Sequence, residues 1–184
     1  MFEEGLTRRQ ALGMGTAAVA AGAVALAPTL APSVAGAASR DDASSNGDAV
    51  RPTITLAEAQ KLLEAAEAKA NEINVPMYVV IVDESGRQAA SIRMDRTPLA
   101  ALTLVPPKAF TAVSFRTPTH VLAQSAAADP VRVASFLASG EFTLLGGGLP
   151  IVRSGAVIGA IGVGGGTPEQ DVVVGQAALT ALAG

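Results

Sequence analysis

The chain of 184 residues contains a single histidine, His120, and no cysteine, so few of its side chains could perform chemistry. Without cysteine it can form no disulfide, iron–sulfur cluster or thiolate-bound haem, and a cysteine nucleophile is excluded. A serine hydrolase would need a serine beside His120, but the sequence lacks the Gly-x-Ser-x-Gly elbow. His120 is therefore expected to be a surface or helix-capping residue or, alternatively, a metal ligand.

A glycine-rich segment, 144–171, is the second place where the residue types suggest a ligand. A helix is predicted to begin at Pro168, and the backbone N–H groups at a helix start can bind an anionic group. A glycine loop that only turns the chain is the alternative. The glycines of 159–164 do not follow the Gly-x-Gly-x-x-Gly order of dinucleotide-binding loops. The candidate anion-binding residues are Gly164, Gly165, Gly166 and Thr167.

The remaining polar candidates are better explained by structure than by chemistry. Asp83 and Glu84 begin the segment 83–87, where acidic side chains usually stabilise a turn, although cation binding is the alternative. The single tyrosine and the nearby methionines lie in apolar strand segments, so we expect them in the core. The net charge of −3 and the isoelectric point near 5.1 argue against nucleic acid as a partner.

Periodicity and turn residues predict the elements that position these side chains. Thr55 and Glu58 form a capping box ahead of a helix that ends near Asn74. Pro106 and Pro107 are expected to end one short helix and begin another. The predicted order is helix 56–74, strands 77–82 and 88–94, helices 99–105, 107–115, 120–127 and 130–138, strands 142–145, 149–152 and 156–163, and helix 168–183. Short hairpin connections favour an α+β fold with an antiparallel sheet.

Residues 1–37 are predicted to be a twin-arginine export signal rather than part of the fold. Arg8 and Arg9 precede an apolar run rich in alanine and glycine, and 35–37 supply small residues for a signal peptidase. An ordinary secretory signal or a transmembrane anchor is the alternative. Residues 38–52 are polar and unpatterned, which predicts a disordered leader. The folded domain is then 53–184, secreted or otherwise extracytoplasmic.

Five motifs, in this order, resemble the GlcG/HbpS family, which is also named the haem-degrading domain family. They are 108–115 (KAFTAVSF), 117–119 (TPT), 146–151 (GGGLPI), 159–164 (GAIGVG) and 167–171 (TPEQD). The resemblance implies a profilin-like fold of α/β/α layers around a five-stranded antiparallel sheet. It also implies homo-oligomers, and haem binding in members exported by the twin-arginine route. The predicted export signal favours this secreted, HbpS-like branch.

The resemblance also implies a site in the helical region. Haem-binding members use a threonine oxygen as an iron ligand, and the matching positions are Thr111 and, less closely, Thr119. His120 is the candidate for an additional or replacement iron ligand. Haem also needs an apolar slot and cations for its propionates. The residues assigned to these two roles are Phe110 and Phe115 for the slot, and Lys108 and Arg116 for the cations. The prolines before Lys108 depart from the family pattern.

We therefore expect an extracytoplasmic haem-binding protein that scavenges, stores or helps to sense haem and its iron. Its expected partners are haem, further copies of the chain and a membrane sensor or transporter. A binding protein is favoured over a catalyst. One alternative is an enzyme, or an enzyme accessory, for a small carboxylate or corrinoid that uses the loop 164–169. The other is a structural oligomer without a ligand.

Overall fold

The computed structural model describes residues 51–183; the predicted export signal, and the predicted leader up to residue 50, lie outside this range. None of the helices in this range is long and apolar enough to cross a membrane. The elements in chain order are α1 (Leu56–Glu72), β1 (Tyr78–Asp83), β2 (Gln88–Arg93), α2 (Leu99–Phe115), α3 (Thr119–Ala126), α4 (Pro130–Ala138), β3 (Gly148–Arg153), β4 (Ala156–Gly164) and α5 (Pro168–Ala183).

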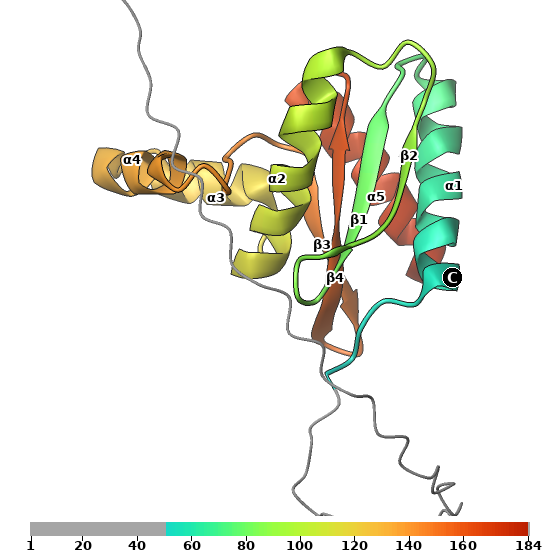
Figure 1. Cartoon of the computed structure of the whole chain (residues 1–184), viewed down its shortest axis with the longest axis horizontal. Coiled ribbons are helices and arrows are strands. Elements are labelled where there is room, and N and C mark those ends of the chain that lie inside the picture. The colour runs from blue at the N-terminus through green and yellow to red at the C-terminus, as the bar shows by residue number, and fades with distance from the viewer. Residues whose placement is uncertain (1–50, 184) are drawn as a thin grey trace, which may run out of the picture. The chain divides into compact units, whose positions relative to one another are not determined.

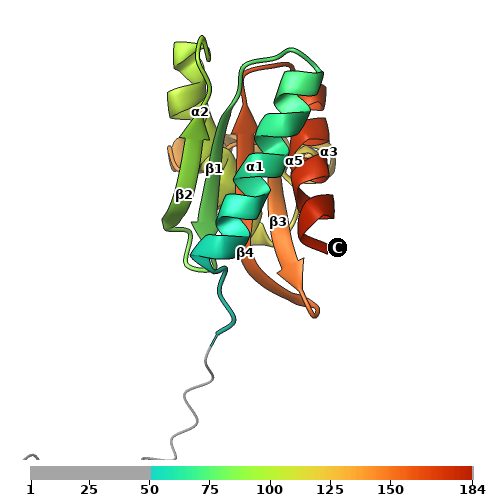
Figure 2. The same ribbon diagram turned by 90° about the vertical axis from the view of Figure 1, so that its right-hand side faces the viewer.

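The four strands form one antiparallel sheet in the order β2-β1-β4-β3. Helices α1 and α5 cover one face of the sheet side by side, and α2 covers the other, with α3 and α4 projecting on the α2 side (Figures 1 and 2). Val79 and Ile81 of β1 pack toward α1 and α5, whereas Val80 and Val82 pack toward α2. This alternation confirms the predicted α/β/α layers.

The prediction of five strands is wrong, because the described residues contain four. The segment 142–145 was expected to be a strand, but it runs beside α2 without joining the sheet. Its backbone N–H groups bond to hydroxyls instead: that of Thr143 donates to Oγ1 of Thr111 at 3.0 Å, and that of Leu145 donates to Oγ1 of Thr143 at 3.2 Å. Backbone groups that are satisfied in this way are not available for a strand ladder.

The predicted break at Pro106 and Pro107 is also wrong, since both prolines lie inside the continuous helix α2. A proline in a helix interior costs about 3 kcal/mol, so packing must offset the loss. At Gly162 of β4, α2 approaches the sheet so closely that an added Cβ would lie 2.6 Å from the carbonyl oxygen of Val105. Residues on this face are buried along the whole helix: Ala101, Val105, Ala109 and Ala112.

Two local predictions are confirmed in detail. The capping box at α1 forms, with Oε2 of Glu58 accepting from the backbone N–H of Thr55 at 2.8 Å and Oγ1 of Thr55 accepting from the N–H of Glu58 at 3.2 Å. Ser154 and Gly155 join β3 to β4 with φ angles of 50° and 79°. Two successive positive φ angles are characteristic of a type I′ turn, which matches the twist of a hairpin.

We expect Thr55→Ala to lower the free energy of unfolding by about 1 kcal/mol at pH 7, because α1 loses its cap. Hydrogen bonds from Thr55, with a contribution from Arg153, hold the pKa of the Glu58 carboxyl below its usual value. The contribution of ionised Glu58 is therefore present above the ordinary glutamate pKa of about 4.3 and is lost as the pH falls through the lower folded-state value. The cost of the substitution should shrink accordingly in urea unfolding at pH 3.

Thr180→Ala is the matched control, because Thr180 is exposed within α5 and its hydroxyl bonds only to the carbonyl oxygen of Gln176. This variant should change the free energy of unfolding by less than about 0.5 kcal/mol at either pH. Equal effects of the two substitutions would contradict the capping role of Thr55.

Candidate functional site

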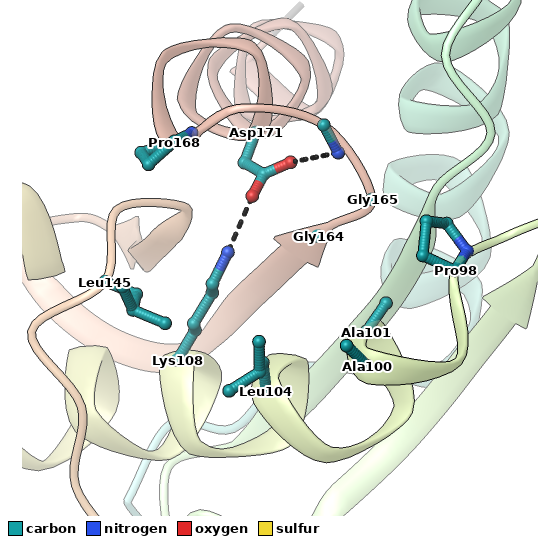
Figure 3. Close-up of a pocket in the computed structure, with 11 residues that line it drawn as sticks. Pro98, Ala100, Ala101, Leu104, Lys108, Leu145, Gly164, Gly165, Pro168 and Asp171 are labelled. Carbon is teal, nitrogen blue, oxygen red and sulfur yellow. Dashed lines mark hydrogen bonds and ion pairs between the residues drawn. The ribbon is translucent and has the colours of Figure 1, made fainter.

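A cavity of about 360 Å³ opens where the first half of α2 meets the end of β4 and the start of α5 (Figure 3). Its rim includes the half-exposed side chains of Leu104 and Leu145. The buried side chains of Lys108 and Asp171 form its inner wall. The cavity is lined by Pro98, Ala100, Ala101, Leu104, Lys108, Leu145, Gly164, Gly165, Gly166, Pro168 and Asp171.

Lys108 and Asp171 form a buried ion pair inside this cavity. Nζ of Lys108 lies 2.6 Å from Oδ2 of Asp171, and the two side chains are 5% and 3% exposed. The same ammonium donates to the carbonyl oxygen of Val163 at 2.9 Å, and Oδ1 of Asp171 accepts from the backbone N–H of Gly166 at 3.1 Å. An ammonium has three N–H donors, so these two bonds leave one donor for a further partner.

The loop that was predicted to bind an anion lines the same cavity. However, the N–H of Gly166 already donates to Asp171, and the N–H of Thr167 donates to Oε1 of Gln170 at 2.9 Å. Thr167 caps α5 at the predicted helix start, since its Oγ1 accepts from the N–H of Gln170 at 3.3 Å. Two N–H groups at this helix start are thus bonded to side chains of α5 itself.

The two threonines predicted as iron ligands are fully buried, and their hydroxyls bond to the backbone. Oγ1 of Thr111 accepts from the N–H of Thr143. Oγ1 of Thr119 accepts from the N–H of Gly148 at 3.0 Å, and Thr119 is the first residue of α3, one residue before the predicted helix start at 120. These bonds hold the segment between α4 and β3 against α2 and α3. The assignment of either hydroxyl to iron stays a prediction.

The predicted slot residues belong to an aromatic cluster of four phenylalanines. Phe110 stacks on Phe142 with 5.5 Å between ring centroids, and Phe115 lies 4.8 Å from Phe136 and 5.2 Å from Phe142. Aromatic rings at these separations attract one another beyond the area that they bury. Phe115 remains 37% exposed, so the cluster, defined as Phe110, Phe115, Phe136 and Phe142, presents an apolar face to solvent.

His120 and Arg116 lie in the same helical region, near the junction of α2 and α3. His120 is half-buried, and its Nδ1 atom is buried with no hydrogen-bond partner among residues 51–183. Arg116 follows α2 in the left-handed conformation, with a φ of 50°, and its side chain lines a separate cleft beside Glu84. Because Lys108 contacts Asp171, the structure does not bring the two predicted cations together.

Asp83 behaves as the turn interpretation predicts. Burial raises the pKa of the Asp83 carboxyl, but hydrogen bonds from Ser85 and Arg87 outweigh it and bring the pKa below its usual value. Oδ1 of Asp83 accepts from the N–H of Ser85 at 2.9 Å and from the N–H of Arg87 at 2.9 Å. Between residues 51 and 183, no group of three or more histidine, aspartate or glutamate residues could hold a metal ion.

Sequence reasoning missed Asp171 as a site residue, along with Phe136 and Phe142. A signal for Asp171 was present, because Asp171, Val174 and Ala178 share one face of α5 at helical spacing. A charged residue on an apolar helix face needs a buried partner. No comparable pattern pointed to the phenylalanines, which meet only through the packing of α4 on α2 and α3.

The model of the family described as "Haem degrading protein HbpS-like" matches residues 54–180. This chain belongs to that family. The solved structures to which it is similar include a PduOC–haem complex, with 32% identity and a TM-score of 0.66 over 70% of this chain and 94% of that one. Another is a double mutant of Streptomyces reticuli HbpS, with 27% identity and a TM-score of 0.66 over 81% and 97%. These likenesses support a profilin-like fold.

Two curated relatives come from Citrobacter freundii. An uncharacterised 15.0 kDa protein in a dhaT–dhaS intergenic region is 41% identical over 69% of this chain and 90% of its own length. The corrinoid adenosyltransferase PduO is 35% identical over 71% of this chain. The HbpS-like chain spans only 39% of that PduO, so the activity of the whole relative does not transfer with the likeness.

Proposed function

We propose that this HbpS-like protein binds haem outside the cytoplasm, where it scavenges, stores or helps to sense haem. Two observations support the proposal at the family level: the match to the HbpS-like haem-degrading family and the likeness to a solved haem complex. The observation in this structure that carries it is the cluster of four phenylalanines, of which Phe115 remains 37% exposed and can meet a porphyrin face. An imidazole nitrogen is a common ligand of haem iron, and the half-buried His120 is the single histidine of the sequence.

Other residues of the helical region fit the other needs of haem. The aromatic cluster offers an apolar face for the porphyrin, to which Phe115 contributes more exposed surface than the buried Phe136. Arg116 supplies a cation for a propionate, whereas Lys108 is bonded to Asp171. Haem would bring an iron atom, and this iron would provide the redox and ligand-binding chemistry. The residues of the chain would bind it, orient it and shield one face from water.

The proposed location rests on the sequence of residues 1–37, with Arg8 and Arg9 ahead of an apolar run. The twin-arginine route exports folded proteins, so the haem site would be formed before the protein leaves the cytoplasm. Assembly into homo-oligomers, and delivery to a membrane sensor or transporter, belong to the same proposal. Exposed apolar side chains on α3 and α4 are consistent with subunit contacts: Val121, Val131 and Leu137.

We expect haemin added to the purified full chain to give a saturable shift of the Soret band. His120→Ala should weaken the binding at least about tenfold, the equivalent of 1.4 kcal/mol, because the iron loses its nitrogen ligand. Added imidazole should restore the wild-type spectrum to His120→Ala, which a merely structural role of His120 would not predict. Gln124→Ala is the control, since Gln124 is exposed on the same helix and should leave binding unchanged.

A Soret titration without any shift would reject haem binding itself. Unchanged affinity and spectrum in His120→Ala would reject His120 as the iron ligand. The two threonine hydroxyls would then be tested by Thr111→Val and Thr119→Val, which remove the oxygen and keep the shape of the side chain. A corrinoid is the second candidate ligand, because the PduO relatives are corrinoid adenosyltransferases. Cobalamin in the same titration decides between the two, since its own visible bands would shift in place of the Soret band.

A further inference from the structure

We propose that the cavity between α2, β4 and α5 binds a small uncharged molecule that carries a hydroxyl group on a short apolar body. The inference goes beyond haem binding and uses different residues. Lys108 and Asp171 sit at the inner wall, and both side chains are at least nine-tenths buried (Figure 3). Ionisable groups that are buried at the wall of a cavity are candidates for a functional role, because a buried pair contributes little net stability.

The hydrogen-bonding capacity left at the pair fits a hydroxyl group. Lys108 has a third N–H donor beyond the two used for Asp171 and Val163. Each carboxylate oxygen of Asp171 has a second lone pair beyond the one used for Lys108 or Gly166. A hydroxyl both accepts and donates, so one ligand oxygen could accept from Lys108 while its hydrogen bonds to Asp171.

The charge balance of the cavity disfavours an ionic ligand. Among the residues between 51 and 183, Lys108 and Asp171 are the only charged ones that line it, and their charges cancel. A carboxylate ligand would be repelled by the carboxylate of Asp171. The N–H of Gly166, which could otherwise donate to the ligand, already donates to Asp171. An ammonium ligand would in turn approach Lys108. Transfer of either ion from water into the cavity would cost several kcal/mol, and no unpaired charge of opposite sign in the described part of the chain lines the cavity to offset that cost.

The remaining walls define the body of the ligand. The rim is made of aliphatic side chains from three parts of the chain: Pro98, Ala101, Leu104, Leu145 and Pro168. A volume of about 360 Å³ accommodates a molecule of a few carbon atoms together with its hydroxyl group. Apolar walls favour the displacement of water by an alkyl chain, because water has few partners there. A primary alcohol with a short chain therefore matches both the wall and the pair.

The test compares three probes that share one carbon chain: butan-1-ol, butyrate and butylammonium. Each is added to the full chain, and the backbone amide resonances of Gly164, Gly165 and Gly166 are followed by NMR. We expect butan-1-ol to shift these resonances with a dissociation constant on the order of millimolar. Butyrate and butylammonium should bind at least about tenfold more weakly, because each brings an uncompensated charge.

Two variants locate the binding. Leu104→Trp fills the cavity from its rim and should abolish the alcohol-dependent shifts, whereas Leu99→Trp, at a 77% exposed position of the same helix, should not. The double variant Lys108→Met with Asp171→Leu removes both charges together and should weaken butan-1-ol about tenfold through the lost charged hydrogen bonds.

Three outcomes would overturn the proposal. Butyrate or butylammonium could bind as tightly as the alcohol, the shifts could persist in Leu104→Trp, or none of the probes could shift these amides. Each outcome is independent of haem, because the probes and the cavity residues play no part in the Soret titration. Failure of either proposal therefore leaves the other standing.

Discussion

Replacing Lys108 by methionine should lower the free energy of unfolding by about 3 to 5 kcal/mol, the usual cost of leaving one member of a buried ion pair without its partner. Asp171 would keep only the hydrogen bond from Gly166, and its side chain is 3% exposed, so water cannot replace the ammonium. The carbonyl oxygen of Val163 would also lose its bond from Nζ. Urea unfolding at pH 7, followed by circular dichroism, measures the effect.

Two comparisons separate this effect from the loss of any lysine. Lys69→Met removes an exposed pair with Glu72, whose side chain is 67% exposed, and should cost less than about 1 kcal/mol. The double variant Lys108→Met with Asp171→Leu should regain most of the loss, because no unpaired charge stays buried. A single-variant cost below that of Lys69→Met would show that water replaces the lost ammonium beside Asp171 in the folded state.

The elements that the sequence predicted correctly are those specified by adjacent residues. Thr55 and Glu58 are three residues apart, and Ser154 and Gly155 form a complete turn between two apolar runs. In both cases the interacting groups lie within one turn of backbone, so residue type and spacing determine the structure. The start of α5 at Pro168, with Thr167 as its cap, follows the same rule.

The two fold errors arose where distant packing outweighs local preference. Pro106 and Pro107 favour a break on their own, but β4 presents Gly162 to α2, and the buried contacts keep the helix continuous. The segment 142–145 has the apolar character of a strand, yet its N–H groups bond to Thr111 and Thr143. Neither partner could be identified from the segment itself.

The candidate site residues show the same difference between what adjacent residues determine and what distant packing determines. Lys108 was predicted as a propionate partner, but its partner in space is Asp171, which is 63 residues away in the sequence. Phe110 and Phe115 were predicted together and do share one cluster, through Phe142. Helix α2 thus contributes Lys108 to the cavity on one side and phenylalanines to the proposed haem region on another. Its placement on the sheet determines both.

Gly148, the first residue of β3, fixes the position of α2 on the sheet. It lies against Lys108 of α2 and Thr119 of α3. An added Cβ would overlap the carbonyl oxygen of Lys108 and would lie 2.7 Å from Cγ2 of Thr119. Its N–H also donates to Oγ1 of Thr119, so any shift of the strand breaks that bond. Both atoms nearest the new methyl group belong to well-buried residues, and the backbone of α2 cannot move away without leaving β4.

We expect Gly148→Ala to lower the free energy of unfolding by about 3 kcal/mol, at the upper end of the cost of overpacking a core. Gly140→Ala is the control: Gly140 has nothing within 4 Å of the added Cβ, and its φ of 70° should cost only about 1 kcal/mol. Gly148 lies against Lys108, which lines the cavity, and against Thr119, which precedes His120. The folded variant should therefore also bind butan-1-ol and haemin more weakly. An unfolding free energy no lower than that of Gly140→Ala would show that α2 can shift on the sheet, and the two proposed sites would then not depend on a fixed helix.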